Sequence, residues 1–273
     1  MEDNYHTALV GQLMASQLQP GKPESPCFCY HVGDIIYAGD CQPGGSEDLY
    51  LGEFYEPYSC YNNPILAIPG NHDSYDNHNR KEALAGFRTN FLNQTKSNPV
   101  LGRPLMDLPY YYWTLNTPLA TIIGLCAISN CIDKEQQTWF DHQTNQAGRE
   151  KCLIVAVHYP PYTYDSQAKG SYTEIAKAIN TASAANSRSP DLVLAGHSHN
   201  YQRISVSHAV PQPSYTCVIT GAGGHDLTEL KETPSIPGAR LEAGNASGYG
   251  ALTITINAKA RTITGSYFIA IPK

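Results

Sequence analysis

Apolar residues of this chain gather in short runs, and each run stops at a turn-forming or polar residue. The four clearest runs have four to six residues and cover positions 27–32, 65–68, 153–157 and 192–195. Runs of this length between turn signals are typical of strands that are buried on both faces. Because such strands belong to sheets that helices cover on both sides, the pattern predicts an α/β fold.

Weaker patterns predict the elements between these runs. Apolar positions at helical spacing indicate a helix over 9–18, which the sequence Pro20-Gly21-Lys22-Pro23 ends. Further helices are expected over 135–146 and 172–185, and further strands over 121–128, 215–220, 253–257 and 262–268, the last two spaced as a hairpin. Residues 73–112, rich in Asn and Pro, are expected to form a long excursion over a site. No linker interrupts the pattern, so residues 1–273 are predicted to form a single domain.

Composition places the chain among folded globular proteins and narrows its partners. Of its 273 residues, 41% are hydrophobic and 15% are charged, which excludes a disordered or collagen-like chain. No apolar run approaches the ~18 residues of a membrane span. The net charge of −6 argues against a broad nucleic-acid-binding surface. We therefore expect no nucleic-acid partner and no membrane partner, and the oligomeric state stays open.

The N-terminal residues and the cysteines bear on the compartment. The chain begins with Glu2 and Asp3 where a secretory signal carries basic residues, so the sequence as written favours a cytoplasmic protein. Eight cysteines are too few for a disulfide scaffold, and no C-x-x-C pair indicates a thiolate zinc site. Buried thiols and a few disulfides both stay open.

The four buried runs end in residues that can bind a metal ion. In chain order these residues are Asp34, then Asn71 and His72, then His158, then His197 and His199. Alone, Asp34 is typical of a helix cap or turn and His158 of a core position. Because ligand sites in open α/β sheets form outside the carboxyl ends of strands, the side chains are expected to converge on one rim. A carboxylate, an amide oxygen and imidazoles in one place suit zinc, manganese or iron, so the joint pattern favours a metal centre.

The same residues stand in motifs that resemble those of the calcineurin-like metallophosphoesterase superfamily. The motifs are Gly33-Asp34-Ile35-Ile36-Tyr37, Gly70-Asn71-His72-Asp73, Val155-Ala156-Val157-His158 and Gly196-His197-Ser198-His199. The purple acid phosphatase branch is similar in Tyr37, Asn200-Tyr201-Gln202-Arg203 and Gly221-Ala222-Gly223-Gly224. The resemblance covers roughly residues 5–225. It implies a four-layer α/β/β/α sandwich in which helices flank two central sheets.

The resemblance also implies a role for each of these residues. Asp34 bridges two metal ions, Tyr37 and His199 complete one site, and Asn71, His158 and His197 complete the other. His72 is not a ligand in this pattern. It hydrogen-bonds the phosphate or protonates the leaving alkoxide, and Asn71 and His158 also border the substrate. The two ions are iron, manganese or zinc, and a phenolate from Tyr37 favours ferric iron in its site.

One part of the family pattern is missing. Members begin with a strand that ends in D-x-G or D-x-H and gives the Tyr37–His199 site its own carboxylate, and no apolar strand precedes the run at 27–32. The Tyr37–His199 site is therefore expected to be weak or empty, and the sheet to expose an edge or to be completed by another segment. An internal Met1 of a longer protein and a genuinely reduced protein both fit this pattern.

The function that the resemblance implies is metal-dependent hydrolysis of a small phosphoester. More specifically, the acid phosphatase likeness implies hydrolysis of phosphomonoesters by a metal-bridging hydroxide. The missing ligand is expected to impair this activity. Two alternatives stay open: a phosphodiesterase or nucleotide pyrophosphatase with the same dinuclear core, and a non-catalytic protein that binds phosphate or metal.

Overall fold

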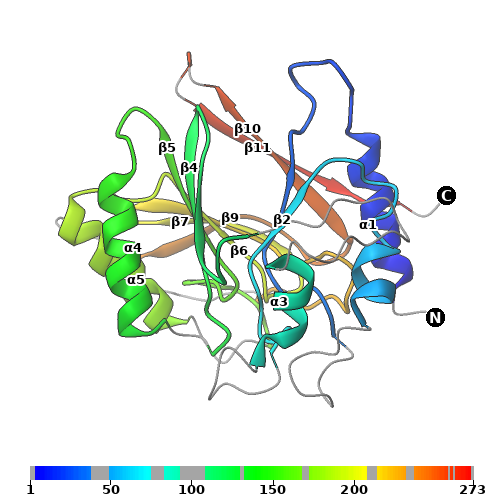
Figure 1. Cartoon of the computed structure of the whole chain (residues 1–273), viewed down its shortest axis with the longest axis horizontal. Coiled ribbons are helices and arrows are strands. Elements are labelled where there is room, and N and C mark those ends of the chain that lie inside the picture. Colours follow the sequence, from blue (N-terminus) through cyan, green and yellow to red (C-terminus); the bar gives the residue numbers. More distant parts are fainter. Residues whose placement is uncertain are drawn as a thin grey trace.

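A seven-stranded sheet with the order β3-β4-β5-β6-β8-β7-β9 forms the centre of the molecule (Figure 1). The structure, a computed structural model, describes residues 4–37, 49–74, 83–92, 108–129, 132–167, 172–207, 214–231, 237–257, 259–260 and 262–271. The strands are β3 (Trp113–Asn116), β4 (Ala120–Leu125), β5 (Cys152–Val157), β6 (Leu192–Ala195), β7 (Tyr201–Val206), β8 (Tyr215–Thr220) and β9 (Ala239–Asn245). Because β4, β5, β6 and β8 run parallel, their carboxyl ends lie at one edge of the sheet.

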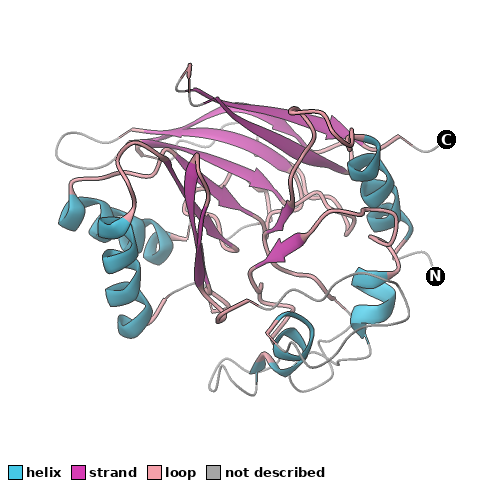
Figure 2. Cartoon of the chain, turned by 45° about the horizontal axis from the view of Figure 1, so that its top comes forward, coloured by secondary structure: helices cyan, strands magenta, loops and turns pink. Residues whose placement is uncertain are grey.

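Two helices, α4 (Lys134–Gln146) and α5 (Thr173–Asn186), lie side by side on one face of this sheet (Figures 1 and 2). Their apolar side chains pack against the strands: Phe140 of α4 and Ile175 of α5 belong to one buried cluster with Val155 and Val193. Burial of each such side chain contributes roughly 1.5–3 kcal/mol. The cluster therefore fixes both helices to the strands whose ends carry predicted ligands.

The opposite face of the large sheet packs against two small sheets. One joins β1 (Cys29–His31) to β2 (Ile65–Ala67) in parallel, and the other is the antiparallel hairpin of β10 (Gly250–Asn257) and β11 (Thr262–Ile269). Ile122, Ile154 and Leu194 of the large sheet meet Leu252 and Ile254 of the hairpin.

Beyond the small sheets lie α1 (Tyr5–Ser16), the short helical segment η2 (Leu51–Tyr55) and α3 (Ala85–Phe91). Side chains of these elements, including Met14, Phe54 and Phe87, pack in a third cluster with Ile65 and Leu66 of the β1–β2 sheet and its flanks. Helices, the large sheet, the small sheets and further helices follow one another (Figure 2). This order confirms the α/β/β/α class.

The second sheet layer differs from the expected continuous sheet, because it is divided. A cavity of about 1260 Å³ lies between β1 and β10, and consecutive residues of both strands line it, 26–35 on one side and 250–256 on the other. Successive side chains of a strand point to opposite faces, so a consecutive lining run indicates a strand edge rather than a face. Val10 and Met14 of α1 also line the cavity. Among the described strands, β1 pairs with β2 alone.

Most predicted elements are present with shifted bounds, and part of one prediction is wrong. The run at 27–32 forms a strand only over β1, and the helix expected over 9–18 begins earlier, at Tyr5. The expected excursion over 73–112 contains α3, whose Phe87 and Phe91 are buried core residues. The strands β3, β7 and β9 lie outside the predicted strands. The core therefore extends into a stretch whose Asn and Pro content predicts loops.

Two expectations from composition concern the described residues. Of the six cysteines in this part of the chain, Cys126 and Cys217 are buried while Cys27 and Cys60 are exposed. The expectation of buried thiols therefore holds for only some of these cysteines. Among the described helices, none combines the length and the apolar character that a bilayer crossing requires.

Phe87 tests whether α3 belongs to the core. Its side chain is completely buried, so Phe87→Ala should lower the free energy of unfolding by about 3–5 kcal/mol, measured by urea denaturation. The control is Leu51→Ala, because Leu51 is 42% exposed and its truncation should change stability by less than about 0.5 kcal/mol. Equal effects of the two variants would contradict the assignment of α3 to the core.

Candidate metal centre

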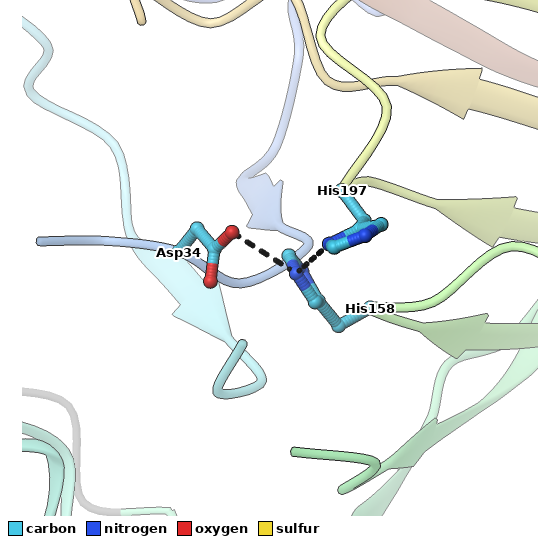
Figure 3. Close-up of side chains that lie close together, drawn as sticks. All are labelled: Asp34, His158 and His197. Carbon is cyan, nitrogen blue, oxygen red and sulfur yellow. Dashed lines mark hydrogen bonds and ion pairs between the residues drawn. The ribbon is translucent and has the colours of Figure 1, made fainter. Parts of the chain in front are cut away.

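Four predicted ligands meet where strands of the large sheet and of the β1–β2 sheet end, and Figure 3 shows three of them, Asp34, His158 and His197. His158 follows β5, His197 follows β6, Asp34 follows β1, and Asn71 lies in the loop after β2. His158 Nε2 lies 3.1 Å from Asp34 Oδ2 and 3.0 Å from Asn71 Oδ1. His197 Nδ1 lies 3.0 Å from the same Asn71 oxygen and 3.3 Å from His158 Nε2. The expected convergence of these four side chains is present.

The spacing of these four atoms suits a metal ion. Ligand atoms of Asp34, His158 and His197 all lie within 4.8 Å of one another. Around a tetrahedral ion with bonds of about 2.0–2.1 Å, neighbouring ligand atoms are about 3.3 Å apart. The distances of 3.0–3.3 Å between donor atoms in this cluster are therefore close to those of a loaded site.

Two of the four ligands have an unusual backbone. Asp34 has φ +54° and His197 has φ +64°, which places both in the left-handed region. Such conformations persist in non-glycine residues only where the surroundings impose them, and they cluster at functional sites. Gly33, with φ +95°, has no room for a side chain, because a Cβ there would lie 2.7 Å from Gly70 N and from His158 Nδ1. The loops thus approach each other closely enough to bring the ligands together.

Backbone carbonyls hold two of the imidazoles by the nitrogen that faces away from the cluster. The ring nitrogen His158 Nδ1 lies 2.8 Å from Val32 O, and His199 Nδ1 lies 2.8 Å from Asp226 O. A carbonyl only accepts, so each Nδ1 carries a hydrogen. In the neutral ring the lone pair is then on Nε2, which is the arrangement that metal-binding histidines commonly show.

The other predicted ligands, Tyr37 and His199, lie next to this cluster. Tyr37 Oη lies 3.2 Å from His199 Nε2, and the Tyr37 ring is 4.7 Å from the ring of His72. The His72 backbone N–H donates to Asp34 Oδ1 at 2.8 Å, while Asp34 Oδ2 faces His158. The two oxygens of Asp34 are therefore held by different neighbours. His225 stacks on Tyr37 with ring centres 4.0 Å apart.

The electrostatics follow from burial and from one close ion pair. Burial alone would raise the pKa of Asp34, but His158 and the His72 N–H outweigh it and hold that pKa below its usual range. Burial lowers the pKa of His158, but Asp34 outweighs this and leaves it raised. Burial and then the neighbouring His158 lower the pKa of His197 to about 3. In the absence of ions, Asp34 thus favours the charged form of His158, while burial favours the neutral form of His197.

Sequence reasoning gave Asp73 no role of its own, although it lies at the end of a quoted motif. Its buried carboxylate accepts hydrogen bonds from Gly70 N at 2.7 Å, from Ile35 N at 3.1 Å and from Tyr50 Oη at 3.3 Å. Burial and then the charge of Asp34 raise its pKa to about 7. One carboxylate therefore ties together the two loops that carry Asp34 and Asn71.

A buried network of polar side chains supports the loop after β6. The hydroxyls of Ser198 and Thr163 lie 2.9 Å apart, and Gln202 Nε2 donates to Thr163 Oγ1 and to Asn200 Oδ1. Asn200 Nδ2 in turn donates to Thr228 Oγ1 at 3.1 Å. Asn200 and Gln202 were noted in the sequence only for their likeness to one branch of the superfamily. In the structure they hold the backbone on which two predicted ligands lie.

Asp73→Asn tests whether the Asp73 carboxylate holds together the loops that carry Asp34 and Asn71. An asparagine retains one acceptor oxygen and turns an NH2 group towards hydrogen-bond donors, so a buried donor loses its partner. We expect the free energy of unfolding to fall by about 1–3 kcal/mol in a denaturant titration. Asp226→Asn, the same change at an exposed position of the rim, should alter it by less than about 0.5 kcal/mol. If Asp73→Asn is as mild as Asp226→Asn, the tie does not hold the loops.

Comparisons with known proteins agree with this arrangement. Residues 9–201 match the model of the calcineurin-like phosphoesterase family, a range that contains every predicted site residue. Among solved structures, the chain is similar to a purple acid phosphatase from yellow lupin (Lupinus luteus) seeds, with a TM-score of 0.65 and 12% identity. That match covers 91% of this chain and 44% of the lupin chain, so this chain spans less than half of the lupin protein's length. The match shows a shared fold, and the family model shows that the chain belongs to the calcineurin-like phosphoesterase family.

Proposed function

We propose that this protein is a metal-dependent phosphoesterase that hydrolyses small phosphomonoesters. The observation that carries the proposal is the set of four donor atoms from Asp34, Asn71, His158 and His197, held 3.0–3.3 Å from their neighbours at the ends of strands. The family assignment supports phosphoester hydrolysis as the reaction. The shared fold with a protein named purple acid phosphatase supports monoesters as the substrates.

The donor chemistry suits two ions. Asn71, His158 and His197 with one oxygen of Asp34 offer amide, imidazole and carboxylate ligands, which fit zinc or manganese. Tyr37 and His199 with the other Asp34 oxygen offer a second set. Its phenol oxygen, once deprotonated, is a hard anionic donor that favours ferric iron. The carboxylate of this second set is that of Asp34, which is shared with the first set. We therefore expect the second set to bind its ion more weakly than the first.

Bound ions would supply the chemistry that the side chains lack: they lower the pKa of water and stabilise the charge of the phosphoryl group during displacement. The chain orients the ester and supplies a proton. His72 is half-buried at the rim, with its ring beside Tyr37 and its backbone bonded to Asp34. We assign His72 as the group that hydrogen-bonds the phosphate and protonates the leaving alkoxide. Asn71 and His158 border the same space.

His197→Ala is the main test of the metal mechanism. Loss of this ligand should reduce metal-dependent hydrolysis of p-nitrophenyl phosphate by at least ~100-fold, because the ion contributes several kcal/mol to the transition state. Chelation of the wild-type protein should have the same effect, and zinc, manganese or iron should restore its activity. His142→Ala, at an exposed position of α4, is the matched control and should retain wild-type rates.

Other outcomes would replace the proposal. Turnover that survives both chelation and His197→Ala would contradict the metal mechanism. Faster hydrolysis of bis(p-nitrophenyl) phosphate than of the monoester would indicate a phosphodiesterase. Bound ions without turnover of either ester would indicate a protein that only binds phosphate or metal.

His72→Ala separates proton transfer from metal binding. The variant should lower kcat for an alkyl phosphate such as glycerol phosphate, whose alkoxide must be protonated as it leaves, by ~10²–10⁴-fold, the usual contribution of a positioned acid, while the metal content per chain stays at the wild-type value. Steady-state kinetics and elemental analysis of one preparation give both numbers. A drop in metal content that parallels the drop in kcat would instead make His72 part of the metal centre.

A further inference from the structure

His197 differs from the other two imidazoles of the centre in what holds it. His158 and His199 each present Nδ1 to a backbone carbonyl, whereas His197 presents Nδ1 to the ligand cluster. Its other nitrogen, Nε2, lies 2.7 Å from the hydroxyl of Tyr172. A side chain therefore takes the place that a main-chain group has at His158 and His199.

We propose that Tyr172 is a positioning residue for the metal centre. Its hydroxyl holds the His197 ring so that Nδ1 is directed at the ion. The inference rests on the proposed function. An imidazole that binds an ion through Nδ1 keeps its hydrogen on Nε2, and the Tyr172 oxygen is placed to accept that hydrogen. Outer partners of this kind fix the tautomer and the orientation of the ring and make it a better ligand.

The backbone of Tyr172 is fixed by its place at the start of a helix. It immediately precedes α5, and its carbonyl oxygen accepts hydrogen bonds from Ile175 N at 3.0 Å and Ala176 N at 3.2 Å. Ile175 and Ile179 of the same helix are completely buried against the large sheet. The position of the phenol is thus set by a helix that packs on the strands preceding His158 and His197.

A second tyrosine contacts the same imidazole in a different way. The ring of Tyr159 lies 4.2 Å from the ring of His197, tilted by 49°, and 4.7 Å from the ring of Tyr172. Ring contact limits the tilt of the imidazole, but it does not distinguish one ring nitrogen from the other. A hydrogen-bond acceptor at Nε2, by contrast, favours the tautomer that carries the hydrogen on that nitrogen. The left-handed backbone of His197 makes this side-chain support more important, because the loop alone is strained.

Tyr172→Phe tests the inference, because it removes the hydroxyl and retains the ring. Zn²⁺ affinity, measured by competition with a chromophoric chelator, should fall by ~10–100-fold, the usual effect of losing an outer partner of a metal-binding histidine. Tyr159→Phe is the matched control: it removes a hydroxyl from the other tyrosine on the same imidazole and should leave the affinity within about twofold. Thermal unfolding of the metal-free proteins checks that both variants fold like the wild type.

A spectroscopic measurement distinguishes positioning from packing. In the Zn²⁺-loaded wild type, the His197 Nε2 hydrogen should give an imidazole N–H proton resonance that exchanges slowly with water. Tyr172→Phe should abolish or rapidly exchange this resonance, whereas Tyr159→Phe should retain it. His197→Ala identifies the resonance by its absence.

The outcomes separate this inference from the proposed function. If the wild type binds no zinc and His197→Ala changes nothing, the metal centre itself is wrong. If the wild type binds zinc, His197→Ala weakens it, and Tyr172→Phe equals Tyr159→Phe in affinity and in the imidazole resonance, the metal centre stands and the role of Tyr172 is overturned.

Discussion

The arrangement of the whole rim depends on keeping four polar atoms in a largely buried place, each 3.0–3.3 Å from at least one of the others. Polar and charged groups are costly to bury unless they have partners, so the surroundings must supply them. Here Val32 O, the His72 N–H and the Tyr172 hydroxyl hold the outer sides of three ligands. The inner sides face one another, with a single carboxylate among them. A cation is the partner that such a donor set is suited to receive.

Support for this cluster comes from well-packed parts of the fold. The buried cluster beneath α4 and α5 fixes β5 and β6, and the polar network of Asn200 and Gln202 fixes the loop after β6. On the other side, Asp73 joins the loops after β1 and β2 through main-chain donors. Each ligand is thus held by contacts that do not involve an ion, which is what a preorganised site requires.

The parts of this structure that could be predicted from the sequence are those with a local signal. Short apolar runs that end at Asp34, Asn71, His158 and His197 mark both the strands and the ligands, because the carboxyl ends of parallel strands share one edge. The strand β7 contains no apolar run, because its buried positions alternate with half-buried or exposed ones and the first of them is the polar Gln202. The helix α3 does have a local signal, because Leu84, Phe87 and Phe91 lie at helical spacing and are buried, but the Asn- and Pro-rich residues around it favour a loop. Tyr172 meets His197 only through the packing of α5, and spacing along the chain does not encode such a contact.

The division of the second sheet layer has a mechanical consequence. Asp34 and Asn71 follow strands of the two-stranded β1–β2 sheet, whereas His158 and His197 follow strands of the seven-stranded sheet. On the side of the cavity, no strand of the described residues pairs with β1. An ion held by all four side chains would link the two sheets directly. Its binding free energy would then add to the stability of the folded protein, so the melting temperature would rise and fall with metal occupancy.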